Sequence, residues 1–240
     1  MIQNLKKIDQ AKEEFINLSA HHLRTPLTII KGYTSMLLDG SFGVIKNKEE
    51  KKALKVIYQS NERLLQLAEK LLTILNLELE ELELNYEIID LSKLTDKIVK
   101  NFKKNIGNKK IKIVYKKTKN LSKVKVDQEM FKQVIKSLVD NSIKYTKTGK
   151  IDIKIYQEKN NVCFSVVDTG VGMNKYFLKS LFQKFSRSNK VFDINPEGTG
   201  LDLYLSQKII KIHGGNIWAE SEGIQKGSAF YFSLPKNKKL

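Results

Sequence analysis

The strongest constraint on folding lies in the first third of the chain, where apolar or small residues repeat at alternating spacings of four and three. This repeat predicts helices that each bury one seam of side chains. The first seam comprises Ile16, Ala20, Leu23, Leu27, Ile30, Thr34 and Leu37, and the second comprises Leu54, Ile57, Asn61, Leu64, Ala68, Leu71 and Leu75. A glycine-rich turn at residues 39–43 would join them. Because a two-helix hairpin cannot bury both seams alone, we expect a second copy to complete a homodimeric four-helix bundle.

Two adjacent histidines, His21 and His22, lie inside the first helical pattern. His21 is one residue off the seam, about 100° around the helix, so it faces the edge of the bundle, where a partner can reach it. Pro26 cannot donate a hydrogen bond to the carbonyl of His22, which predicts a bend beside the pair. Thr25 follows His21 by four residues and therefore lies one turn along the same face.

The periodicity changes after about Ile88. Strand-type alternation or short apolar runs occur at Ile111–Tyr115, Ile151–Tyr156 and Val162–Val167, and helical patterns occur at Leu91–Phe102, Asp127–Lys144 and Leu201–His213. Strands and helices mixed in this way favour an α/β sandwich with helices on one face of a sheet. We therefore expect two domains, a helical hairpin at residues 1–84 and an α/β domain at residues 85–240, joined by an acidic hinge.

The net charge of +17 comes almost entirely from lysine, because the chain has only three arginines. Base readout and bidentate phosphate contacts favour arginine, so we expect no nucleic-acid binding. A lysine-rich surface would instead attract ATP and an acidic partner protein. The chain has no run of about 18 apolar residues, so the sequence predicts no membrane segment. We expect a cytoplasmic chain; a membrane anchor of the full-length protein, if one exists, would lie outside it. The single cysteine, Cys163, excludes an intrachain disulfide.

Five short motifs follow one another along the chain in a recognisable order. They are Ser19–Thr28 around the histidine pair, Gln133–Thr146, Asp168–Met173, Leu181–Phe185 and Gly198–Leu203. In this order they resemble the H-box, the N-box, the first glycine box, the F-box and the second glycine box of the two-component sensor histidine kinases. One such motif alone would be a weak signal, but five in order extend the resemblance over nearly the whole chain.

This resemblance implies a dimerisation and phosphotransfer hairpin followed by an ATP-binding domain of the type shared by histidine kinases and gyrase. It implies ATP-dependent autophosphorylation of His21 and transfer of the phosphoryl group to an aspartate of a response regulator receiver domain. Thr25 would support dephosphorylation of that regulator. His22 would stand where the family has the acid that takes the proton from the nucleophilic histidine.

The resemblance also assigns a nucleotide site. Asn141 would bind Mg²⁺ through its amide oxygen, a hard donor that suits this ion. Lys144 and Tyr145 would contact the phosphates and the adenine edge, and Asp168 would accept a hydrogen bond from the adenine amino group. Backbone of the two glycine boxes would approach the nucleotide and cradle its phosphates, and the residues concerned are Gly170, Gly172, Gly198, Thr199, Gly200 and Leu201.

Three positions depart from the family pattern. His22 replaces an acid, Ser137 replaces the first Asn of the N-box, and Asp202 replaces the last Gly of the second glycine box. A neutral imidazole can act as a base near pH 7, but a carboxylate near phosphates is unfavourable unless it points away or meets Mg²⁺. These changes leave two alternatives open: a degenerate member that acts as a phosphatase or dimeric scaffold, and a related ATPase without phosphohistidine. The polar segment 186–197 is expected to be a mobile lid.

Overall fold

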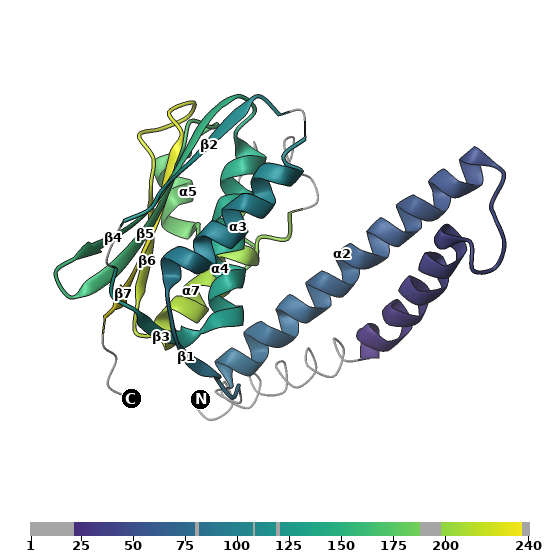
Figure 1. Ribbon diagram of the computed structural model, residues 1–240, viewed down its shortest axis with the longest axis horizontal. Helices are drawn as coiled ribbons and strands as arrows, with labels where there is room; N and C mark the ends of the chain where they lie inside the picture. The colour runs from purple at the N-terminus through teal and green to yellow at the C-terminus, as the bar shows by residue number, and fades with distance from the viewer. Residues whose placement is uncertain (1–21, 80–81, 108, 119–120, 188–197, 237–240) are drawn as a thin grey trace, which may run out of the picture. The chain divides into compact units, whose positions relative to one another are not determined.

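The computed structural model describes residues 22–79, 82–107, 109–118, 121–187 and 198–236 of the 240-residue chain. The chain divides into two compact units, residues 1–82 and 83–240. The first unit is helical and the second combines a sheet with helices (Figure 1). Within the described ranges, no helix has a stretch both long and apolar enough to cross a bilayer.

The N-terminal unit is the helical hairpin that the heptad spacing predicts. Its first helix is described over residues 22–39, and α2 spans Lys48–Glu78. The two helices contact each other through polar groups as well as through their seams. Asn61 of α2 donates a hydrogen bond from Nδ2 to the carbonyl oxygen of Leu27 at 2.7 Å, and Lys31 forms an ion pair with Glu62.

Much of the apolar seam of this hairpin remains accessible. Ala68 and Leu65 of α2 are buried, as is Thr34 of the first helix. In contrast, Leu23, Ile30, Ile57 and Leu64 are between 43% and 55% exposed. A single hairpin therefore leaves uncovered the side chains that the sequence pattern assigns to contact with a second copy.

The C-terminal unit is built on a five-stranded mixed sheet in the order β2-β4-β5-β7-β6. Its strands are β2 (Ile111–Lys116), β4 (Gly149–Glu158), β5 (Asn161–Asp168), β7 (Ser228–Pro235) and β6 (Asn216–Glu220). Only β2 and β4 are parallel, and all other neighbours are antiparallel. A separate antiparallel ribbon pairs β1 (Tyr86–Ile89) with β3 (Val124–Asp127). Four-residue strands are too short to show a periodic pattern, which is why the sequence did not predict this ribbon.

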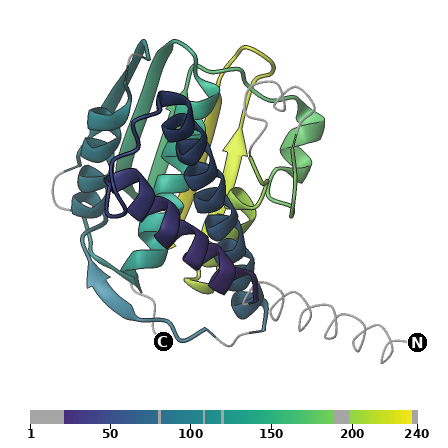
Figure 2. The ribbon, with the colours of Figure 1, turned by 90° about the vertical axis from the view of Figure 1, so that its right-hand side faces the viewer.

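Three helices cover one face of the sheet: α3 (Leu91–Asn105), α4 (Gln128–Tyr145) and α7 (Asp202–Ile212) (Figures 1 and 2). Each begins and ends within three residues of the predicted bounds. Asp90 caps α3 and Asp127 caps α4, because each side chain accepts hydrogen bonds from amides of the first turn. A short helix, α5 (Lys175–Ser180), follows the first glycine box. This arrangement confirms the predicted α/β sandwich.

The core between sheet and helices is apolar and aromatic. Ile151, Ile153 and Ile155 of β4 are completely buried, whereas Lys154 between them is exposed, so one face of the sheet meets the helices. Phe232 of β7 stacks on Phe164 at 4.9 Å and meets Phe131 of α4 edge-on at 5.9 Å. These rings join the centre of the sheet to its covering helices.

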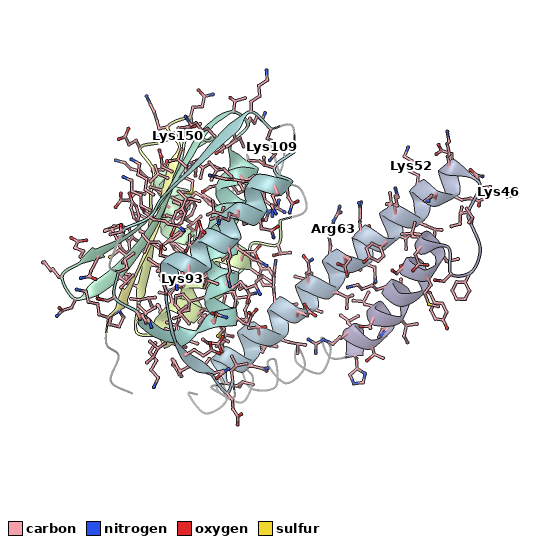
Figure 3. The ribbon with its side chains drawn as sticks, in the orientation of Figure 1. Lys46, Lys52, Arg63, Lys93, Lys109 and Lys150 are labelled. Atoms are coloured by element: carbon pink, nitrogen blue, oxygen red, sulfur yellow. The ribbon has the colours of Figure 1, made fainter. Side chains whose placement is uncertain are left out.

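The basic residues project away from this core. In Figure 3, Lys93 and Lys150 point outward from the C-terminal unit, and Lys46 and Lys52 extend from the end of the hairpin at which its two helices are joined. The high net charge is thus a property of the surface, as expected for groups that are costly to bury.

Replacing Phe232 with alanine should lower the free energy of unfolding by about 3–5 kcal/mol, because it removes a buried ring and leaves a cavity beside Phe131 and Phe164. Chemical denaturation followed by circular dichroism measures this change. Tyr176→Ala is the control, because Tyr176 is 86% exposed and its loss should change stability by less than about 0.5 kcal/mol. Equal effects of the two substitutions would contradict this account of the core.

Candidate functional site

One cavity of the C-terminal unit gathers most of the nucleotide-site residues that the motifs predict. It has about 790 Å³ of empty space, part of which is open to solvent. Its walls come from α4, the end of β5, α5, the start of α7 and the start of β7. The predicted site residues that line it are Asn141, Lys144, Tyr145, Asp168, Gly172, Gly198, Thr199 and Gly200. Residues far apart in the sequence thus converge on one hollow, large enough for a nucleotide-sized ligand.

Asp168 is the most deeply buried polar group of this cavity, with 4% of its surface exposed. It ends β5, and its Oδ1 accepts hydrogen bonds from the amides of Gly170 at 2.8 Å and Ser228 at 3.3 Å. Burial raises the pKa of this carboxyl above its ordinary value, and the two amides offset the rise only in part. A carboxylate has about four acceptor positions, so Asp168 can also accept a hydrogen bond from a ligand.

A charged cluster lies on the α4 side of the cavity. Lys144 Nζ forms an ion pair with Asp140 Oδ2 at 2.6 Å, one helical turn away. Burial would lower the pKa of Lys144, but the hydrogen bond and charge of Asp140 outweigh it, with a smaller contribution from Asp202, and the pKa is raised. Lys144 is therefore a firmly cationic group beside the cavity. Asp202, in the first turn of α7, also lines the cavity.

The glycines of the first glycine box pack closely against the backbone of neighbouring loops. Gly172 has φ +64°, and a Cβ there would overlap the carbonyl oxygen of Gly223. Gly170 does not line the cavity; its carbonyl oxygen accepts from the amide of Gly227 at 3.1 Å. The first box therefore holds together the loops around Asp168; of the two glycines expected to approach a ligand, Gly172 lines the cavity and Gly170 does not. This close packing of two backbones is invisible in the sequence.

The second glycine box meets the cavity at the beginning of α7. Gly198, Thr199 and Gly200 line it, but the side chain of Leu201 is buried and does not. Leu201 is the N-cap of α7, and no side chain caps this helix. The N-terminus of α7, with the positive end of the helix dipole, thus meets the cavity without a side-chain cap, an arrangement that favours an anion there.

Sequence reasoning missed the apolar part of the cavity and one cation. Val171, Met173, Phe177, Leu181, Leu203 and Phe230 line it, as does Arg187. An apolar wall suits a flat aromatic ring, such as a nucleobase. Phe177 and Leu181 come from α5 and the residue after it, so only tertiary structure brings them to the site. Ser137, the departure in the N-box, does not line the cavity.

The residues of the histidine motif belong to the N-terminal unit. His22 and Thr25 are exposed on the first helix. His21 lies outside the described residues, as do residues 188–197, which make up most of the expected lid.

Two family matches account for these features. Residues 11–80 match the His Kinase A (phospho-acceptor) domain, and residues 126–238 match the histidine kinase-, DNA gyrase B- and HSP90-like ATPase. The sensor protein SrrB of Staphylococcus aureus is 31% identical over 237 residues, which are 97% of this chain. The chain belongs to the sensor histidine kinases. It spans 40% of the length of the SrrB proteins that it matches.

Solved structures of histidine kinases share this fold. Full-length ShkA, in complex with AMPPNP, has a TM-score of 0.78 at 22% identity, over 92% of this chain and 45% of ShkA. Histidine kinase AdeS of Acinetobacter baumannii has a TM-score of 0.64 at 27% identity, over 91% of this chain and 98% of its own. The catalytic domain of ThkA has a TM-score of 0.56 at 28% identity, over 64% of this chain and 99% of its own. The likeness therefore extends over both units of the kinase.

Asp168→Asn should weaken ATP binding roughly 10- to 100-fold, because the amide can still accept from Gly170 and Ser228 but loses the charge-assisted bond to an amino group. The same change should not destabilise the ligand-free protein at pH 7. The raised pKa means that ionised Asp168 costs stability, and this cost grows as the pH rises through that pKa.

Titration calorimetry with ATP, and thermal melts at pH 4 and 7, measure both effects. Asp152→Asn is the control, since Asp152 pairs with Lys150 away from the cavity. A strongly destabilised Asp168→Asn protein, or one with normal ATP affinity, would disprove this role.

Asp202→Asn should raise the affinity for ATP, roughly threefold to tenfold, because it removes a negative charge that lines the cavity and acts on Lys144, the residue expected to meet the phosphates. Calorimetry at low and high salt measures the gain, which should shrink at high salt. Glu129→Gln removes a charge from α4 outside the cavity and should leave ATP affinity unchanged. An unchanged or lower affinity of Asp202→Asn would show that its carboxylate points away from the phosphates or helps to bind them.

Proposed function

We propose that this chain is an ATP-dependent protein histidine kinase that phosphorylates His21 and passes the phosphoryl group to an aspartate of a response regulator. The observation that carries the proposal is the buried, amide-bound carboxylate of Asp168 in a cavity that Lys144 and the N-terminus of α7 also line. We assign dimerisation and phosphotransfer to residues 1–84 and catalysis to residues 85–240.

In this proposal the cavity supplies a separate contact for each part of ATP. Asp168 accepts from the adenine amino group, while Met173 and Phe230 contribute apolar surface to the wall near it. Lys144 and the first amides of α7 meet the phosphate oxygens, which carry the negative charge that these groups attract. Tyr145 lines the same wall.

Asn141 is the residue through which we expect the protein to hold Mg²⁺. Its side chain lines the cavity next to the Asp140–Lys144 pair, and an amide oxygen is a hard donor. Within the described part of the chain, no cluster of three or more His, Cys, Asp and Glu side chains forms a cage for a metal. This donor set fits an ion that takes its other ligands from phosphates and water. When bound, Mg²⁺ would neutralise phosphate charge.

The proposed reaction needs a nucleophile, a base and a leaving group. A nitrogen of the His21 imidazole attacks the γ-phosphorus, the bond to the β–γ bridging oxygen breaks, and ADP leaves with the electron pair. The His21 ring then loses the proton of its other nitrogen. His22 is exposed beside it and is our candidate to accept this proton.

We also propose that the kinase is a homodimer and that it acts in the cytoplasm without contacting nucleic acid. The exposed seam residues Leu23, Ile30, Ile57 and Leu64 support the dimer, because a contiguous apolar strip on a soluble unit calls for a partner. The partner for phosphotransfer would be a receiver domain that reaches His21 at the edge of this bundle.

A second activity, dephosphorylation of the regulator, is supported by the hydroxyl of Thr25. The hydroxyls of Thr28 and Thr34 donate to carbonyl oxygens of their own helix, at 2.8 Å and 2.6 Å. Thr25 makes no such bond to any described residue and is exposed. Its hydroxyl is therefore available to orient a water molecule that attacks the phosphorus of an aspartyl phosphate, with the aspartate leaving.

His21→Gln should reduce phosphorylation to background, whereas His22→Gln should still be phosphorylated, though more slowly if His22 accepts the proton. Incubation with γ-labelled ATP, followed by mass mapping at alkaline pH, identifies the acid-labile phosphate. Phosphate on His22 of the His21→Gln protein would overturn the assignment of the acceptor. Loss of ATP binding in either variant would indicate damage to the fold.

Thr25→Ala should slow dephosphorylation of a receiver domain roughly tenfold, the loss expected for one hydrogen bond of about 1.4 kcal/mol, while leaving phosphorylation of His21 intact. Thr28→Ala is the matched control, since the hydroxyl of Thr28 is already bound to the carbonyl of Arg24. The release of labelled phosphate from a purified receiver measures the rate. Equal rates for the two variants would indicate that Thr25 has only a packing role beside Pro26.

A further inference from the structure

A groove between two helices of the C-terminal unit is rimmed by lysines at one-turn spacing. From α3 come Lys93, Lys97 and Asn101, and from α4 come Gln128, Lys132 and Lys136. Residues four apart lie one turn along the same face of a helix, so each helix presents a polar stripe to the groove. The hollow has about 1330 Å³ of empty space, part of it open to solvent, and shares no residue with the ATP cavity.

The groove continues along α3 beyond this first hollow. A second hollow shares Ile98, Asn101 and Lys136 with the first and extends to Ile106 and Lys109. The stretch from residue 93 to residue 106 is about 20 Å long at 1.5 Å per helical residue. We call the two hollows together the lysine-rimmed groove. Its length matches three to four turns of a docked helix.

The protein's own acids balance the positive charge of this groove only in part: Glu87 and Asp90 line the first hollow, and Lys132 pairs with Glu129. Asp90 is engaged at the N-terminus of α3, where it accepts from the amides of Ser92 and Lys93. Asp140 is paired with Lys144. Among the residues that the structure describes, Lys93, Lys97, Lys123 and Lys136 form no ion pair with an acidic side chain. An anionic partner would therefore gain contacts that the protein itself does not supply.

The floor of the groove is apolar. Ile89, Leu94 and Ile98 line it and are largely buried, but Ile88 of β1 is 69% exposed at its edge. A bulky β-branched side chain exposed to this extent beside lysines provides an anchor for an apolar group. Basic rims around an apolar strip complement a helix with one apolar face flanked by acids.

We propose that the lysine-rimmed groove docks an acidic amphipathic helix of a partner protein; the first hollow lies outside the ATP cavity, and of the second hollow only Lys144 also lines that cavity. The acids of that helix, one turn apart, would face the lysines of α3 and α4, and its apolar face would cover Ile88. Nucleic acid fits less well, because no arginine lines either hollow, and the aromatic residue that lines the second hollow, Phe102, is partly buried.

A labelled peptide tests the proposal on the whole chain. The probe is a fluorescein-labelled helical peptide of about 14 residues, with leucine along one face and glutamate on both flanks. Fluorescence anisotropy should show binding that weakens as salt is added. Lys93→Glu combined with Lys97→Glu should lower the affinity roughly tenfold or more, because two attractions become repulsions.

The control is Lys112→Glu combined with Lys154→Glu, which makes the same change of net charge at exposed positions of β2 and β4. These two substitutions should change the affinity less than twofold or so. Both double variants should keep normal ATP binding and normal thermal melts, since the altered side chains are exposed and lie outside the ATP cavity. Equal loss of peptide affinity in the two double variants would reduce the proposal to non-specific charge attraction and overturn it.

The Ile88→Ser variant distinguishes binding of an amphipathic helix from binding of other polyanions. It should weaken peptide binding roughly threefold or more, because it removes the exposed apolar anchor without changing charge. Binding of a single-stranded oligonucleotide of equal net charge should be weaker than that of the peptide and insensitive to Ile88→Ser. Tighter binding of the oligonucleotide, or peptide binding unaffected by Ile88→Ser, would refute the docking of an amphipathic helix.

Discussion

The hydrogen bonds that Asp168 accepts from Gly170 and Ser228 fix the geometry on which the C-terminal unit depends. They join the end of β5 to the following loop and to the start of β7. Burying a carboxylate is costly, and the raised pKa of Asp168 shows that two amides do not cover the whole cost. A ligand that donates a further hydrogen bond relieves part of it. In the proposed function, the group whose burial costs stability in the empty site is thus also the one that recognises the ligand.

The helical parts of the fold were readable from the sequence because their signals are local. Heptad spacing predicted the hairpin, and apolar periodicity placed the ends of α3, α4 and α7 to within three residues. The β1–β3 ribbon was not predicted, because a strand of four residues is too short to show an alternating apolar pattern. The order of the sheet, with β7 between β5 and β6, depends on pairing across long stretches of chain and has no local signal.

The candidate site was predictable to the extent that its residues belong to contiguous motifs. Asp168, Asn141 and Lys144 were found in this way, and the structure brings them to one cavity. The apolar wall was not found, because a Phe or Met that lines a cavity looks like a core residue in the sequence. Gly170 was expected to approach the ligand; the structure shows that it packs closely against the backbone of Tyr145 and does not line the cavity, a contact that the motif does not reveal. Such contacts depend on the distances between loops in the folded chain, which cannot be inferred from the spacing of residues in the sequence.

The buried amide of Asn61 has a consequence for how the hairpin can transmit movement. Its Nδ2 is bound to the carbonyl of Leu27, while its Oδ1 is buried without a partner among the described residues. Sliding or rotating one helix against the other would break this bond and leave the whole amide unsatisfied, at a cost of about 1–3 kcal/mol. A polar residue in a helical seam fixes the alignment of its helices in this way. The Asn61 hydrogen bond thus couples the two helices of one hairpin. A displacement of the first helix is therefore expected to move the second helix with it.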